Sequence, residues 1–197
     1  MVSPTYTRAA GFSLVEILVT LVIVMIGLLG LLGVQVRSHQ AELEAYQRAQ
    51  ALVLMADIVA RLNGNRQGNA HECYANANNG TAYLGIGNAV TPTCAGAGTT
   101  TTRARADADL LAWDDLLKGA AETDGGNVGA MVGARGCILV IDPAARIYRV
   151  SVAWQGVIPT DAPLDAAGIP ITCGTGLYGN ENVRRAVSTT VRIATLI

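Results

Sequence analysis

The feature that most constrains this chain is an uncharged apolar run near its N-terminus. Ile17 to Val36 gives twenty consecutive residues without Asp, Glu, Lys or Arg. A helix of that length spans roughly 30 Å, which is the thickness of the hydrocarbon core of a bilayer. The run therefore predicts a membrane-spanning helix, and any globular structure must be built from the residues that follow it.

A cleavable secretory signal is the first alternative for this run. The apolar core of such a signal is usually about 7–15 residues long and ends at a small-residue cleavage site. This run is longer, and nothing resembling A-x-A follows it, so the sequence favours a retained anchor. One basic residue, Arg8, precedes the run, and Arg37 and Arg48 follow it, so the positive-inside rule gives no clear orientation.

A single carboxylate, Glu16, directly precedes the apolar run. An acidic group in a membrane is costly and usually marks a functional position. Two interpretations remain open. Glu16 can lie in the first turn of the helix and complement the positive end of its dipole. Alternatively, the chain is cut between Gly11 and Phe12, and Glu16 pairs with the new amine at Phe12 of a neighbouring subunit.

The segment GFSLVEILVTLVIV, residues 11–24, resembles the N-terminal motif of type IV pilins and pseudopilins. That family has a short polar leader ending in Gly, an aromatic residue after the cut, Glu four residues beyond it, and a long apolar helix. The resemblance implies that prepilin peptidase cleaves after Gly11 and N-methylates Phe12. It also implies that Glu16 helps to dock the subunit into a growing helical filament.

The sequence departs from the pattern of major pilins within the apolar helix. Major pilins usually carry a helix-bending proline in its second half, whereas this chain has Gly27, Gly30 and Gly33 and no proline until Pro92. Each Gly lowers helix propensity by about 1 kcal/mol relative to Ala, and small residues also allow close helix approach. Local melting, close packing and simple tolerance of Gly in a membrane helix all remain open.

Four cysteines occur in the chain, and none forms a C-x-x-C pair. With His39 and His71 as the only histidines, the ligand spacing does not predict a zinc site, and we expect no metal. Outside the cytosol, two disulfides are the better interpretation. Three pairings are possible. We favour those that close sequence-local units, Cys73 with Cys94 and Cys137 with Cys173.

The helical pattern continues beyond the apolar run to Gly64 and predicts one helix of about fifty residues. Its second half is amphipathic, and a coiled coil is the alternative to packing on a domain. The positions assigned to the apolar, core-facing side are Leu43, Tyr46, Ala49, Val53, Ala56 or Ile58, and Leu62. The positions assigned to the polar side are Glu42, Glu44, Arg48 and Asp57.

The remaining chain predicts a small α+β head. We expect loop structure over residues 76–102, a short helix over 109–118 with solvated Asp residues, and a polar loop over 159–182. Strands are expected over residues 135–142, 146–156 and the final run from 184. In the second strand, Tyr148 to Trp154 alternate between apolar and more polar residues, which is typical of a half-buried strand.

Several downstream motifs are similar to the type IV pilus modification protein PilV group of minor pilins. They are the helix end ARLNGNR, the short helix DLLAWDDLLK, RGC before a strand, VAWQG and the terminal RR strand. The resemblance implies a leader (1–11), a transmembrane and filament-core helix (12–36), its amphipathic half (37–66) and a periplasmic α+β head (67–197). It also implies an inner-membrane, single-pass protein that later enters the pilus at the cell surface.

The function implied is that of a minor pilin in initiation and assembly of the type IV pilus. Its partners would be prepilin peptidase, other minor and major pilins, the pilus assembly platform, and membrane lipid before assembly. We find no catalytic constellation or phosphate-binding loop and expect no cofactor. The alternatives are a minor pseudopilin of a type II secretion system, a membrane-anchored adhesin-like binding domain, and a secreted enzyme.

Nucleic-acid binding is a further possibility that the sequence does not favour. The net charge is −1, so no overall field attracts the chain to phosphate. Two arginine pairs, Arg103 with Arg105 and Arg184 with Arg185, could contact phosphate. Pairs of arginines on a nearly neutral domain are weak support for such a role, so we expect no nucleic-acid partner.

Overall fold

A computed structural model describes residue 11 and the ranges 13–120 and 131–195. The chain divides into two compact units, Met1–Glu42 and Leu43–Ile197. In the described residues the first unit is helical, whereas the second combines helices with one antiparallel sheet. The α+β fold class expected from the sequence is confirmed.

The first long element is α1, a 51-residue helix over Leu14–Gly64. The Ser13 carbonyl opens it by accepting hydrogen bonds from the N–H groups of Glu16 and Ile17, at 3.0 and 3.3 Å. Gly64 ends it, as the sequence predicts. Among the described helices, α1 is the one that is long and apolar enough to cross a membrane.

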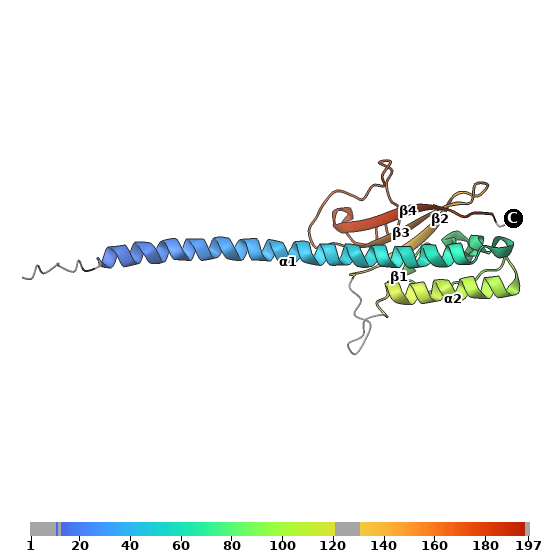
Figure 1. The fold of residues 1–197 in the computed structure, drawn as a ribbon, viewed down its shortest axis with the longest axis horizontal. Coiled ribbons are helices and arrows are strands. Elements are labelled where there is room, and N and C mark those ends of the chain that lie inside the picture. Colours follow the sequence, from blue (N-terminus) through green and yellow to red (C-terminus); the bar gives the residue numbers. More distant parts are fainter. Residues whose placement is uncertain (1–10, 12, 121–130, 196–197) are drawn as a thin grey trace, which may run out of the picture. The chain divides into compact units, whose positions relative to one another are not determined.

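The second unit contains a four-stranded antiparallel sheet in the order β1-β2-β3-β4 (Figure 1). Its strands are β1 (Leu84–Gly85), β2 (Arg135–Asp142), β3 (Ile147–Gln155) and β4 (Arg184–Arg192). The three longer strands were expected from their apolar, β-branched composition. The two-residue β1 was not, because it lies in a segment that reads as a loop.

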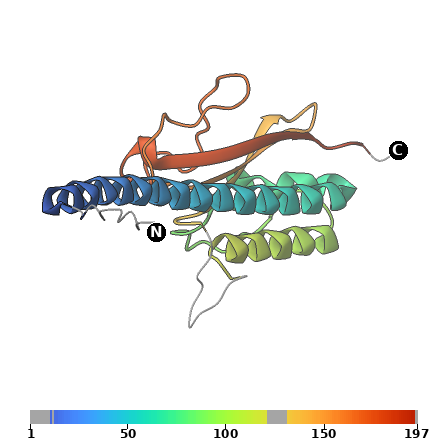
Figure 2. The ribbon, with the colours of Figure 1, turned by 60° about the vertical axis from the view of Figure 1, so that its left-hand side comes forward.

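A second helix, α2 (Thr100–Leu117), lies alongside the part of α1 that belongs to the head, as Figures 1 and 2 show. The expected helix over 109–118 was too short at its N-terminus. Thr99 caps α2 by accepting from the Thr102 N–H, while the Thr102 hydroxyl accepts from the Thr99 N–H. This capping box turns a threonine run that looked like loop sequence into a helix start.

The predicted loop over residues 76–102 also contains ordered turns. The 3₁₀ segments η1 (Gln67–Tyr74) and η2 (Asn76–Asn79) lead into β1. The side chain of Asn76, the first residue of η2, bonds to the backbone of β2. It donates to the Gly136 carbonyl at 3.4 Å and accepts from the Ile138 N–H at 3.1 Å. A side-chain amide thus takes the place of a neighbouring strand at this edge of β2.

The face of α1 that packs on the head agrees with the predicted one at Ile58 and Leu62 and differs from it at the other predicted positions. Ala51, Ile58 and Leu62 are fully buried, whereas Leu43 and Val53 are 55% and 62% exposed. The predicted stripe through Ala49, Val53 and Ala56 does exist, but it lies on the opposite side of the helix. This half of α1 carries apolar residues on two opposite sides. Periodicity alone therefore identified an apolar stripe but did not show which of the two sides the head covers.

A second layer of burial covers the other face of the sheet. Ser151 and Ala153 on β3 are buried, although the alternating pattern predicted a half-buried strand. Cys137, Ala153, Ile171 and Cys173 form a small cluster there. The loop before β4 supplies the last two of these residues, so β3 is enclosed on both sides by parts of the chain that a local pattern does not reveal.

Candidate functional site

The N-terminal segment carries the residues that the sequence singled out. Gly11 is exposed and lies outside regular structure, and α1 begins three residues later. Glu16 lies in the first turn of α1, where the helix dipole is positive. Among the described residues, nothing pairs with its carboxylate. Phe12 and the leader residues 1–10 lie outside the described residues.

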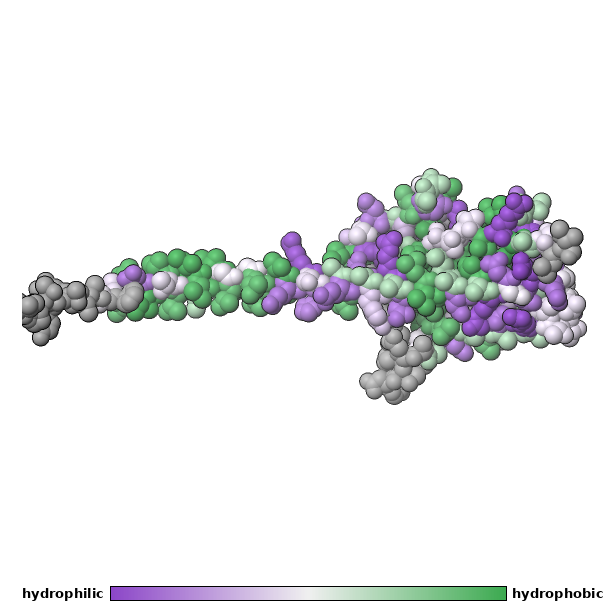
Figure 3. All heavy atoms as spheres, in the orientation of Figure 1, coloured by the Kyte–Doolittle hydropathy of each residue, from purple (hydrophilic) through white to green (hydrophobic). Residues whose placement is uncertain are grey.

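Beyond Glu16, the first part of α1 presents an apolar surface that no charge interrupts up to Val36. Every large apolar side chain from Leu14 to Val36 is exposed, with fractions from 46% at Val22 to 81% at Leu14. Figure 3 shows this segment almost entirely in hydrophobic colours. Apolar surface of this extent is not left in water by a stable protein, so lipid or other protein must cover it.

The start of the chain, including much of the apolar part of α1, matches a known family motif. Residues 6–32 match the prokaryotic N-terminal methylation motif. The match spans Gly11, Phe12 and Glu16 and indicates a type IV pilin-like protein of the kind that prepilin peptidase processes. No curated protein and no solved structure matches the chain. The methylation motif overlaps the apolar first part of α1, and a small antiparallel sheet follows this helix in the chain, an arrangement consistent with a pilin-like fold.

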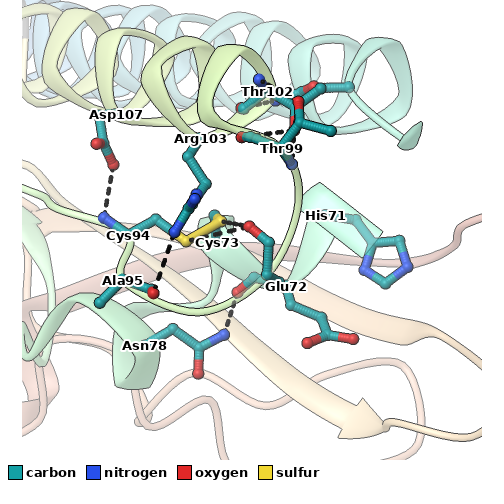
Figure 4. The surroundings of a disulfide bond; sticks show 12 residues. His71, Glu72, Cys73, Asn78, Cys94, Ala95, Thr99, Thr102, Arg103 and Asp107 are labelled. Carbon is teal, nitrogen blue, oxygen red and sulfur yellow. Dashed lines mark hydrogen bonds between the residues drawn. A yellow bond between two sulfur atoms is a disulfide. The ribbon is translucent and has the colours of Figure 1, made fainter. Parts of the chain in front are cut away.

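Two disulfides cross-link the head, which follows the methylation motif in the sequence. Cys73 bonds to Cys94 and Cys137 to Cys173, with Cα–Cα distances of 5.2 and 5.8 Å. These are the pairings that the sequence favoured. Figure 4 shows the first of them, which joins η1 to the segment before α2, where the Cys94 N–H also donates to Asp107 at 2.8 Å. Such bonds are typical of proteins that fold in an oxidising compartment.

Of the two arginine pairs considered as phosphate contacts, Arg184 and Arg185 are occupied within the head. Arg184 is buried, donates to Glu181 at 2.6 Å, and also donates to the carbonyls of Ile171 and Cys173. Arg185 donates to Glu44 on α1 at 3.1 Å. Both guanidinium groups therefore hold the loop before β4 in place.

The Glu44 carboxylate of α1 binds three groups from the segments around β4. It accepts from the N–H groups of Val157 and Ile158 as well as from Arg185. Burial opposes its ionisation, but the hydrogen bonds from Ile158 and Arg185 outweigh burial and lower the pKa of Glu44. Glu44 was assigned to a polar side of α1, and its polar partners come from the head itself.

The Asp residues of α2 were expected to form a solvated face, and for two of them this is wrong. Asp109 accepts from the Tyr74 hydroxyl at 2.6 Å and pairs with Arg61 of α1 at 3.1 Å. Asp114 is buried and accepts from the Gly85 N–H at 2.6 Å. Within the described ranges, no group of three or more His, Cys, Asp or Glu side chains is arranged to hold a metal ion.

His71 is buried beside β3, and its neighbour Cys73 is held in a disulfide. Its Nδ1 lies 3.0 Å from the hydroxyl of Tyr148, another buried side chain. Burial lowers the pKa of His71, and the nearby Arg146 lowers it further against the opposing effect of Glu72. Burial raises the pKa of Tyr148 to about 12. Both side chains are therefore neutral at neutral pH.

We expect the stability of the head to fall at acidic pH because of His71. The folded pKa lies below the ordinary value of 6.5, so the unfolded chain takes up the proton first. The free energy of unfolding should fall as pH drops below 6.5, by up to about 1.4 kcal/mol per pH unit for one proton. Urea denaturation of the full chain in detergent, from pH 7.5 to 5, measures it. The same pH slope in His71→Asn would contradict this role.

Proposed function

We propose that this chain is a minor type IV pilin of the PilV group. Prepilin peptidase removes residues 1–11 and methylates Phe12, and helix residues 12–36 hold the subunit in the inner membrane. The head, residues 67–197, lies in the periplasm until the subunit enters the pilus. The observation that carries the proposal is the match of residues 6–32 to the methylation motif. The downstream motifs of the PilV group support the finer assignment.

The proposed role is structural and depends on helix packing. In lipid, apolar side chains gain little hydrophobic energy by meeting one another, so packing and polar pairing must provide the specificity. The pairing is that of Glu16 with the Phe12 amine of a neighbouring subunit. The exposed apolar stripe through Ala49, Val53 and Ala56 supports this role, because it faces away from the core of the head.

The N-terminus of the envelope-associated protein tests the processing step. Mass spectrometry should find a chain that starts at methylated Phe12. An intact Met1 would instead support a plain membrane anchor, and a start beyond residue 36 would support a secretory signal. A Gly11→Val variant is the matched control, and we expect it to keep its leader because cleavage requires the small residue before the cut.

The location of the processed subunit separates a pilus from a secretion pseudopilus. The methylation motif fits a minor pseudopilin of a type II secretion system equally well. We expect the protein in pili sheared from the cell surface, at low abundance relative to the major pilin. Its absence from sheared pili, together with a secretion defect in a deletion strain, would favour the pseudopilin.

A further inference from the structure

Three side chains from separate segments form a stack on the head. The guanidinium carbon of Arg135 lies 5.4 Å from the ring centroid of Tyr83 and 4.6 Å from that of Tyr178. Tyr83 precedes β1, Arg135 opens β2, and Tyr178 belongs to the loop before β4. All three side chains are partly exposed. We call this group the Tyr–Arg–Tyr stack.

Hydrogen bonds hold the stack in one arrangement. Arg135 Nη1 and the Tyr178 hydroxyl both donate to the Gly133 carbonyl, at 3.1 and 2.9 Å. A partner that binds here would therefore meet a guanidinium that is already ordered. This matters because fixing a long side chain at an interface otherwise costs about 0.5–1.5 kcal/mol.

Glycines bring the backbone close to the stack. Gly133 has a φ of +63°, and a Cβ there would lie 3.3 Å from Tyr178 and 3.5 Å from Arg135. Gly174 has a φ of +70°, and a Cβ there would lie 2.8 Å from the Tyr178 ring. Residues with side chains rarely adopt this φ, so the stack depends on a backbone that few other sequences could form.

Among the described residues of the head, no carboxylate neutralises the charge of Arg135. Arg61, Arg149, Arg184 and Arg185 each pair with a carboxylate at 3.1 Å or less. In the described part of the chain, no carboxylate lies within ion-pair distance of Arg135, and its buried Nε has no acceptor. A guanidinium that is flanked by rings and unpaired attracts a carboxylate from outside.

Exposed apolar residues adjoin the stack along the chain. Ile86, Val132 and Leu177 are 39%, 58% and 42% exposed. Leu177 precedes Tyr178 directly, and the Ile86 N–H donates to the carbonyl of Ala134, the residue before Arg135. Tyrosine and arginine surrounded by apolar contacts are the composition of an interface hot spot.

We propose that the Tyr–Arg–Tyr stack docks the head of a different pilin-type subunit, which places a carboxylate against Arg135 and apolar residues around it. An exposed ion pair alone is worth little, so a small carboxylate would bind weakly, whereas a protein surface also covers the apolar neighbours. The nature of the partner rests on the proposed function. The contact itself rests on the geometry and charge of the stack.

Site-specific photo-crosslinking in cells tests the proposal. A benzophenone amino acid at Val132 should form an adduct with a protein that carries an N-terminal methylation motif, identified by mass spectrometry. The same probe at Leu111 on α2, which is also exposed, should not form this adduct. Arg135→Gln should reduce the Val132 adduct about tenfold or more, as expected when a hot-spot charge is lost. Arg105→Gln, at an exposed arginine of α2, should leave it unchanged.

Two further measurements distinguish docking from a role in which the Tyr–Arg–Tyr stack only stabilises the folded head. The thermal unfolding midpoint of Arg135→Gln should stay close to that of the parent chain. Arg135→Glu should regain the adduct when the acidic residue at the partner's crosslinked site is changed to Arg, which loss of stability alone would not allow. Failure of this rescue would overturn the proposal, as would an unchanged adduct in Arg135→Gln.

The identity of the crosslinked protein decides the partner. The proposed docking of a different pilin-type subunit would be overturned by adducts with a second copy of this chain only, or only with proteins that lack the methylation motif. The N-terminus is measured in the same samples. Processing at Phe12 combined with a wrong partner would contradict this inference alone, whereas an unprocessed chain would contradict the proposed function.

Discussion

Gly136→Ala should lower the free energy of unfolding of the head by about 3 kcal/mol, the upper part of the range for overpacking a core. A Cβ at this position on β2 would lie 2.6 Å from Cζ3 of Trp113 and 2.7 Å from Cδ1 of Leu117. Trp113 is fully buried and donates from Nε1 to the Leu54 carbonyl at 2.9 Å. The ring cannot move away without losing that bond, so the strand or α2 must shift.

Urea unfolding of the full chain in detergent, followed by tryptophan fluorescence, measures this effect. Gly96→Ala is the matched control, because a Cβ there meets nothing within 4 Å, and its effect should stay within about 0.5 kcal/mol. In a double variant, the effects of Trp113→Leu and Gly136→Ala should be non-additive, because the smaller side chain leaves room for the new methyl group. Equal stabilities of Gly136→Ala and Gly96→Ala would show that the core absorbs the methyl group.

The elements that sequence predicted well are those determined by their own residues. Gly64 ends α1 because the apolar repeat stops there and the polar residues 65–69 follow. The strands β2, β3 and β4 are rich in β-branched residues and are bounded by turn residues. The N-terminal motif is likewise local, and the family match over residues 6–32 supports it, whereas the roles of Gly11, Phe12 and Glu16 stay predictions.

Apart from the start of α2, the features that sequence missed depend on distant parts of the chain. The capping box of α2 is local, but Thr runs are common in loops, so the pattern did not select a helix start. The face of α1 could not be chosen, because Ala51 is buried through contacts with residues from the rest of the head, while the apolar Val53 is not covered. Burial of Ser151 required the loop that Cys173 attaches to β2.

The Tyr–Arg–Tyr stack has no sequence signature at all. Tyr83, Arg135 and Tyr178 are separated by about fifty and forty residues and obey no period. The register of β1 against β2 pairs Gly85 with Arg135, and the disulfide at Cys173 holds the segment that carries Tyr178. Only the folded head brings the three side chains together.

Glu16→Ala should leave the subunit processed and inserted in the membrane but reduce its amount in sheared pili by a factor on the order of 100. Removal of a charge near an apolar helix favours insertion, so the membrane step should not suffer. In the filament, however, the amine of Phe12 on a neighbouring subunit would be left without its partner in apolar surroundings, and breaking a buried pair is strongly unfavourable. Immunoblots of membrane and sheared-pilus fractions measure both amounts.

The competing explanation, in which Glu16 only complements the helix dipole, makes a different prediction. Any carboxylate in the first turn serves that purpose, and α1 begins at Leu14. In a Val15→Glu, Glu16→Ala double variant the acid stays in the first turn but moves about 100° around the helix. A dipole role predicts that this variant assembles normally, whereas docking requires the original position and predicts a defect as large as in Glu16→Ala. Glu42→Ala, which removes a well-exposed carboxylate on the same helix, should assemble normally under either explanation, so a defect there would mean that loss of charge alone impairs assembly.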